Sequence, residues 1–139
     1  MTLQELSQIY YLNREIAADK KRLDELNRIL GAPASPPMSD MPRAPHGVES
    51  KVERLAAEIV DLQAIIAARQ IQCIHERARL ERWINDIPDS LTREIFKCRF
   101  VDCLTWLGVA RCVGGNNTEG GVKMICYRYL REEEKEETV

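Results

Sequence analysis

Residues 105–131, TWLGVARCVGGNNTEGGVKMICYRYLR, contain two helical patterns separated by a short stretch of glycine and asparagine. Thr105 is suited to cap the first helix, because its hydroxyl can accept a hydrogen bond from a free backbone N–H. The glycine pair 114–115 is suited to end that helix, since glycine readily adopts the left-handed conformation found after helices. Asn116 or Asn117 is expected to begin the second helix. The stretch therefore predicts a short helix, a tight turn and a longer helix.

Each of these two helices has an apolar side that is expected to be buried. The apolar residues recur at spacings of three and four, which places them on one face of a helix. A short helix, a glycine-containing turn and a second helix with basic and aromatic residues on its outer side are the parts of a helix-turn-helix. We expect its core to contain Phe100, Trp106, Val109, Ala110, Val122, Ile125 and Tyr129.

The outer side of the second helix carries the residues expected to bind DNA. Lys123, Tyr127 and Arg131 follow one another at intervals of four, so a helix places them together. Cationic side chains in a major groove can reach phosphates or guanine edges, and tyrosine can bind a phosphate or pack on a thymine methyl. Gly120 and Gly121, at the start of this helix, have no side chains that could read bases there. The predicted DNA-binding residues are Asn117, Thr118, Lys123, Tyr127, Arg128 and Arg131.

The distribution of charge permits this interpretation, although the formal net charge of the whole chain is −2. Residues 89–131 contain seven basic and four acidic side chains, whereas the stretch after them is strongly acidic. A local basic excess favours contact with nucleic acid. The same pattern also fits a plain three-helix cap whose lysine and arginine side chains are only solvated. Spacing alone does not separate these two interpretations.

Two longer patterns precede this block and predict a helical hairpin. Apolar residues alternate at spacings of three and four over residues 9–30 and again over residues 48–87, which is typical of helices that pack along each other. The proline-rich stretch 31–47 is expected to separate the two helices. Polar residues interrupt the rows at Asp19, Arg69 and Glu76. We expect a coiled-coil-like antiparallel hairpin; the alternative is that both helices pack against those of a second copy.

The expected fold class is therefore all-α, with three parts. Residues 1–87 form the hairpin with its connection at 31–47, residues 88–131 form a three-helix helix-turn-helix domain, and residues 132–139 form a solvated acidic tail. Pro88 is expected to end the second hairpin helix. Asp89 or Ser90 is expected to cap the next helix.

A resemblance adds to this interpretation. Residues 89–106, DSLTREIFKCRFVDCLTW, resemble the opening of the fourth region of bacterial sigma factors, and more specifically small phage and prophage regulators of the ArpU and RinA kind. Those regulators have an Arg-aromatic-aliphatic triplet, here residues 99–101, before a short turn and a Thr-Trp pair, here residues 105–106. The stretch SPPMSDMPRAPHG and the following VERLAAEIVDLQ are similar to the middle of the same proteins, so the resemblance covers about residues 35–130.

The resemblance implies a fold and a function. It implies a sigma-like helix-turn-helix that binds double-stranded DNA and controls phage gene expression, with host RNA polymerase as a partner. Trp106, Val109 and Ala110 would be core residues of its first helix, and residues 117–131 would form the recognition helix. The protein would act in the cytoplasm of the bacterial host, as a homodimer if the hairpin associates with a second copy.

The sequence carries no pattern that favours an enzyme. It contains no phosphate-binding GxxxxGK motif and no GxSxG nucleophile motif. Its five cysteines lack the CxxC spacing of structural zinc sites, so we expect no metal and no cofactor. No apolar stretch reaches the length of a membrane span.

Two other functions fit the same pattern. Small terminase subunits, which package DNA, also join a helix-turn-helix to helical oligomerisation elements. A degenerate helix-turn-helix can instead bind a protein partner and no DNA, which Gly120, Gly121 and the acidic end would suit. Oligomeric state separates the first alternative from a regulator, because packaging subunits form rings of many copies.

Overall fold

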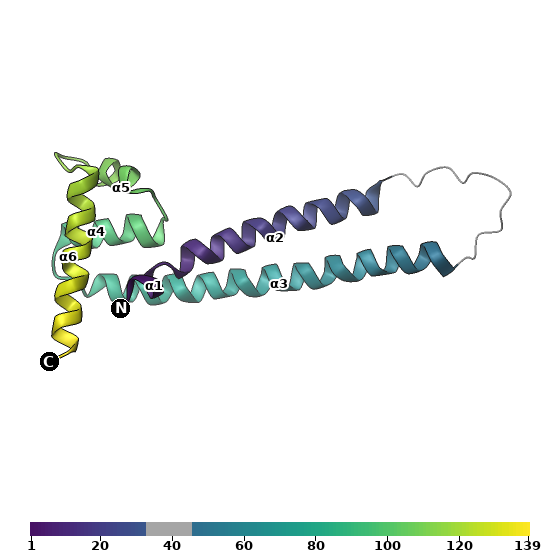
Figure 1. The fold of residues 1–139 in the computed structure, drawn as a ribbon, viewed down its shortest axis with the longest axis horizontal. Helices are drawn as coiled ribbons and strands as arrows, with labels where there is room; N and C mark the ends of the chain where they lie inside the picture. Colours follow the sequence, from purple (N-terminus) through teal and green to yellow (C-terminus); the bar gives the residue numbers. More distant parts are fainter. Residues whose placement is uncertain (33–45) are drawn as a thin grey trace. The chain divides into compact units, whose positions relative to one another are not determined.

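A computed structural model describes residues 1–32 and 46–139 (Figure 1). All regular secondary structure in these residues is helical, so the predicted all-α class is confirmed. The elements are α1 (Leu3–Leu6), α2 (Gln8–Gly31), α3 (His46–Asn85), α4 (Ser90–Phe96), the π-helix η1 (Lys97–Val101), α5 (Trp106–Val113) and α6 (Glu119–Glu137). Most of the predicted connection at 31–47 lies outside the described residues.

The described chain divides into two compact units. Unit 1 consists of Met1–Asn13 and Gln72–Val139, and unit 2 consists of Arg14–Ile71. The predicted boundary at residue 87 does not coincide with this division. The reason is that Leu80, Ile84 and Ile87 belong to the same buried cluster as α4 and α6, so the end of α3 is part of the core of unit 1.

Unit 2 contains residues of α2 and α3 that lie side by side (Figure 1). Ile16 and Leu26 of α2 and Ile59 and Ile66 of α3 are buried, and all four belong to the apolar rows seen in the sequence. Two polar residues that interrupt those rows, Asp19 and Arg69, form an ion pair with each other. Arg69 Nε also lies 3.4 Å from a carboxylate oxygen of Glu15. These two interruptions are therefore matched across the two helices.

Unit 1 is built around a core that includes residues from both ends of its sequence. Leu6 of α1, Leu80 of α3, Phe96 of α4 and Val122 of α6 are fully buried in one cluster. Aromatic rings extend this core. Phe96 contacts the rings of Trp83 and Tyr129, with centroids 5.4 and 5.5 Å apart, respectively. Offset and edge-on aromatic contacts of this kind add to the stabilisation from burial.

The helices of the C-terminal block begin where short polar side chains cap them. Asp89 accepts a hydrogen bond from the backbone N–H of Thr92 at the start of α4, at 3.0 Å. Helix α4 passes directly into η1, where the N–H of Asp102 donates to the carbonyl of Lys97, at 3.0 Å. This bond spans five residues and closes a wider turn than that of an α-helix.

No helix among residues 1–32 and 46–139 is long and apolar enough to span a membrane.

Candidate nucleic-acid interface

Helices α5 and α6 are joined by residues 114–118. Thr105 caps α5 by accepting from the N–H of Gly108, at 3.1 Å. Gly114 and Gly115 follow α5 with φ angles of 72° and 65°, a region that favours glycine. The connection is slightly longer than the turn of about 3–4 residues that joins the helices of a typical helix-turn-helix.

The predicted start of α6 is wrong by one or two residues. The cap is Thr118, whose hydroxyl accepts from the N–H of Gly121 at 3.0 Å, and not Asn116 or Asn117. Asn117 is used differently, because its side-chain amide donates to the carbonyl of Gly114 at 2.9 Å. Both Asn117 and Thr118, predicted as DNA contacts, are thus engaged in shaping the turn.

The expected core of this block is buried to different degrees. Phe100, Val109, Ala110 and Val122 are buried. Trp106, Ile125 and Tyr129 are half-buried, at the edge of the same cluster. A helix pair held in this way keeps the outer side of α6 free for contacts with another molecule.

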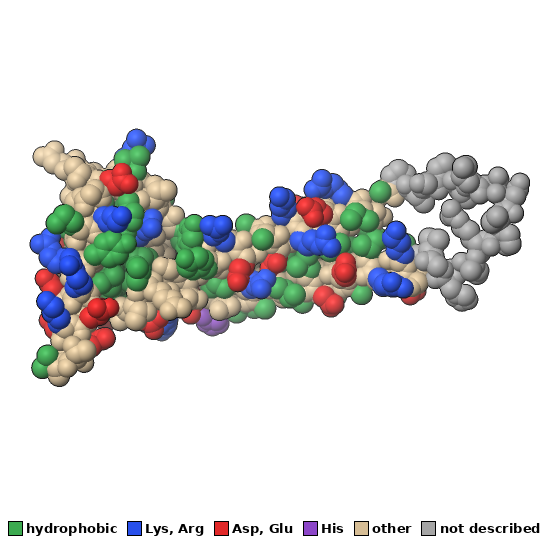
Figure 2. All heavy atoms as spheres, viewed as in Figure 1, with side chains coloured by type: hydrophobic (Ala, Val, Ile, Leu, Met, Phe, Trp, Pro, Cys, Tyr) green, Lys and Arg blue, Asp and Glu red, His purple; other side chains and the backbone are tan. Residues whose placement is uncertain are grey.

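The outer side of α6 is basic from Lys123 to Arg131. Lys123, Arg128 and Arg131 are exposed and Tyr127 is half-buried. The Nε of Arg131 donates to the carbonyl of Tyr127 at 3.4 Å, so these two residues adjoin on the helix. Figure 2 shows basic side chains gathered along α6, with acidic ones toward its C-terminal end. We call Lys123, Tyr127, Arg128 and Arg131 the basic face.

Two residues near the basic face were missed by sequence reasoning. Met124 is 67% exposed, and at 100° per residue it lies between Lys123 and Arg128 around the helix. Arg99 of η1 places its guanidinium carbon 4.5 Å from the centre of the Trp106 ring, a cation–π distance. The Trp106 ring lies 6.0 Å from that of Tyr127. A helical projection would have found Met124, but the position of Arg99 depends on tertiary packing.

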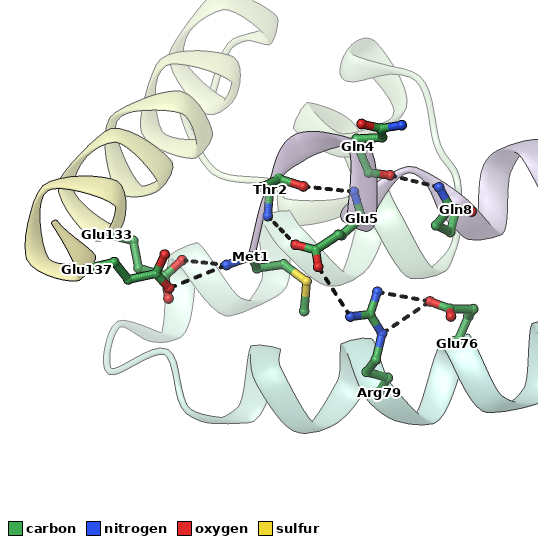
Figure 3. A network of polar contacts seen from close by, with 9 residues as sticks. All are labelled: Met1, Thr2, Gln4, Glu5, Gln8, Glu76, Arg79, Glu133 and Glu137. Atoms are coloured by element: carbon green, nitrogen blue, oxygen red, sulfur yellow. Dashed lines mark hydrogen bonds and ion pairs between the residues drawn. The ribbon is translucent and has the colours of Figure 1, made fainter.

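The C-terminal end of α6 makes contacts within unit 1. The acidic stretch expected as a solvated tail continues α6 as far as Glu137. Trp83 Nε1 donates to Glu133 at 3.2 Å, and the amino group of Met1 lies 3.9 and 3.7 Å from carboxylate oxygens of Glu133 and Glu137, respectively (Figure 3). Burial raises the pKa of Glu133. Glu133 and Glu137 therefore serve contacts within unit 1, and the basic face ends before them at Arg131.

A second exposed surface lies on α3 within unit 2 and consists of Ala57, Val60, Ala64, Ala67 and Ile71, which we call the apolar stripe. Its apolar residues follow the alternating spacing of three and four that is typical of helix–helix packing. All are exposed, with Val60 at 62% and Ile71 at 56%. Sequence reasoning missed this row because it followed only the one that contains Ile59 and Ile66.

The described residues contain no group of three or more His, Cys, Asp or Glu side chains arranged to hold a metal ion. Comparison of the chain with protein-family models, with curated proteins and with solved structures finds no match. The candidate interface is therefore defined by its own geometry and charge.

Proposed function

We propose that this chain is a DNA-binding regulator of phage or prophage transcription, in which α5 and α6 act as a sigma-like helix-turn-helix. The observation that carries the proposal is the basic face, an exposed row of cations on a helix that follows a short capped helix and a glycine turn. In this proposal the paired helices of unit 2 form the arm of a hairpin. The sequence resemblance adds host RNA polymerase as partner and the bacterial cytoplasm as location.

Recognition by α6 would combine charge with a few base contacts. Lys123, Arg128 and Arg131 would neutralise phosphates, a contribution that depends on salt but not on base sequence. Tyr127 could donate to a phosphate, and the exposed Met124 could pack against a thymine methyl. Gly120, at the start of α6, carries no side chain to read a base. We therefore expect most of the affinity to be independent of base sequence. A second copy or a protein partner would add the remaining specificity.

The test is a mobility-shift titration on fragments of a phage or prophage genome at about 50 and 200 mM salt, where several phosphate contacts cause a steep loss of affinity. Exchanging Lys123 and Arg128 for glutamate is expected to weaken binding by at least tenfold, because each loses a phosphate contact and adds repulsion. The matched control is Lys20→Glu with Lys21→Glu. It changes the net charge equally on exposed positions of α2.

The two double variants distinguish a local effect from one of total charge. Loss of binding in the α6 variant with retention in the α2 control supports the proposal. Equal loss in both, or unchanged affinity of the α6 variant, would contradict it. Circular dichroism of each variant checks that the helices remain folded.

The apolar stripe keeps a second function under consideration, that of a DNA-packaging subunit. Such a subunit needs an oligomerisation surface beside its DNA-binding element, and the stripe provides an exposed one. Sedimentation of the native chain separates the candidates. A dimer fits a regulator that reads two half-sites, whereas a ring of many copies fits packaging.

A further inference from the structure

Two thiols of unit 1 lie in direct contact outside the basic face. The Cys98 thiol of η1 donates to the sulfur of Cys112 on α5, with the two Sγ atoms 3.1 Å apart. Cys98 is buried, with 5% of its surface exposed, and Cys112 is exposed. A disulfide bond is about 2.0 Å long. The two sulfurs are therefore about one ångström from bonding distance.

We propose that Cys98 and Cys112 form a redox-responsive dithiol that a hydroperoxide oxidises to a disulfide joining η1 to α5. The two cysteines differ in access, as the two members of such a pair should. The exposed Cys112 can meet an oxidant from solution. The buried Cys98 is held next to it and can react only with what forms on Cys112.

The steps balance with hydrogen peroxide as the oxidant. The Cys112 thiolate attacks one peroxide oxygen, the O–O bond breaks, and the products are a sulfenic acid on Cys112 and, after protonation, one water. The Cys98 sulfur then attacks the Cys112 sulfur, loses its proton, and expels the sulfenic oxygen as a second water. Two thiols and one peroxide thus give one disulfide and two waters.

The surroundings of Cys98 fit the second role and not the first. Burial, and then the hydrogen bond with Cys112, raise the pKa of the Cys98 thiol to about 12. A thiol reacts as its thiolate, so the raised pKa slows Cys98 as a nucleophile, and its burial keeps it from oxidants in solution. Its contact with Cys112 gives it a high local concentration at the one sulfur it can reach. Cys126 is also buried, and burial raises its pKa to about 12, but among the described residues it makes no contact of the kind that joins Cys98 to Cys112.

The other cysteines provide internal controls. Cys73 and Cys103 both contact the side-chain amide of Asn13, at 3.8 and 3.9 Å, respectively, so that the amide stands between them. Cys103 has a positive φ of 57°, and both thiols are half-buried. A nonselective oxidation would reach these thiols as well, whereas a built pair reacts first.

The experiment treats the reduced full-length chain with hydrogen peroxide, blocks the remaining thiols and maps the peptides by mass spectrometry. The expected result is a Cys98–Cys112 linked peptide, lighter by two hydrogen atoms and restored by dithiothreitol. The oxidised chain is expected to melt on the order of 5 °C higher than the reduced one, because the link closes a loop in the unfolded chain. Cys112→Ser should abolish both effects, and Cys126→Ser should abolish neither.

A further variant tests the order of the steps. Cys98→Ser leaves the exposed Cys112 without its partner, so a sulfenic acid on Cys112 should persist and be trapped by dimedone. Absence of the linked peptide in the native chain would overturn the proposal. An equal amount of a Cys112–Cys103 linked peptide would also overturn it, because the contact between Cys98 and Cys112 would then not direct which disulfide forms.

Discussion

Gly120 and Gly121 adjoin each other at the start of α6, but their surroundings differ. A Cβ added at Gly120 would meet nothing within 4 Å, whereas one added at Gly121 would lie 3.0 Å from the hydroxyl oxygen of Thr118. That oxygen is the cap of α6. We expect Gly120→Ala to stabilise the chain by up to about 0.5–1 kcal/mol, because alanine restricts the unfolded chain and favours the helix.

Gly121→Ala is expected to give a smaller gain or a loss. Its methyl group would displace Thr118, and a threonine cap contributes about 1 kcal/mol. The measurement is urea unfolding of both variants, followed by circular dichroism under identical conditions. Equal stabilisation by the two substitutions would contradict the difference described for the two sites.

Single residues show which features the sequence could predict. Thr105 was predicted as a cap, and Asp89 as one of two alternatives with Ser90, from rules that involve only neighbouring residues, and the structure has Asp89 and Thr105 as caps. Thr118 was missed as a cap because the asparagines before it satisfy the same rules, and the choice depends on Asn117 bonding to Gly114. The contact of the Arg99 guanidinium with the Trp106 ring joins η1 to α5. Periodicity within one element cannot reveal a contact between two elements.

The pairing of α2 with α3 in unit 2 includes one polar match, Asp19 with Arg69. Their side chains are 20% and 33% exposed, respectively, so solvent weakens the attraction between them. We expect Arg69→Ala to destabilise the chain by about 0.5–1.5 kcal/mol, because it leaves Asp19 partly buried without its partner. Asp19→Ala should cost less, since Arg69 retains Glu15.

Replacing both residues by leucine tests what the pair contributes. Leucine continues the apolar row on both helices, so Asp19→Leu with Arg69→Leu is expected to be neutral or stabilising. Urea unfolding of the native chain, the two single leucine variants and the double variant gives the coupling energy. A double variant that is less stable than either single one would show that the ion pair does more than fill a gap in the row.

At the scale of elements, the sequence predicted the rows but not their matching. Ile16, Leu26, Ile59 and Ile66 were recognised from periodicity, and the structure buries them. Asp19 and Arg69 were read as interruptions, because a one-dimensional pattern does not show which position faces which. Only the relative register of the two helices turns two defects into one contact.

The apolar stripe on α3 leads to a prediction for the whole molecule. Its alanines allow close approach of another helix, and Gln63 and Gln70, which flank it on one side, carry no charge. We expect the stripe to bind the stripe of a second copy. Ile71→Glu should then convert a dimer to a monomer, because it would bury an unpaired carboxylate.

The matched control for this variant is Ile65→Glu. Ile65 is 45% exposed, close to the 56% of Ile71, but it does not belong to the stripe. Analytical ultracentrifugation of the native chain and both variants is the measurement. A native chain that is monomeric at all concentrations, or a dimer lost equally in both variants, would rule out the stripe as the interface.

At the largest scale, the helical class could be predicted and the division of the chain could not. The predicted boundary followed Pro88, where one helix pattern ends. The structure instead groups residues 72–87 and the first thirteen residues with the C-terminal block. The cause is the burial of Leu6 and Ile9 in the same cluster as Leu80 and Val122. Contacts between such distant parts of a sequence leave no periodic signal.

The π-helix η1 has a consequence for how related chains could vary in length. Its wide turn accommodates one residue more than an α-helical turn would. A deletion of one residue there would remove the surplus residue and leave an ordinary α-helical turn. The segments before and after it would keep their places, because the wide turn takes up the difference in length. The π-helix is therefore a point at which the chain can gain or lose one residue while α4 and α5 keep both their positions and their side chains.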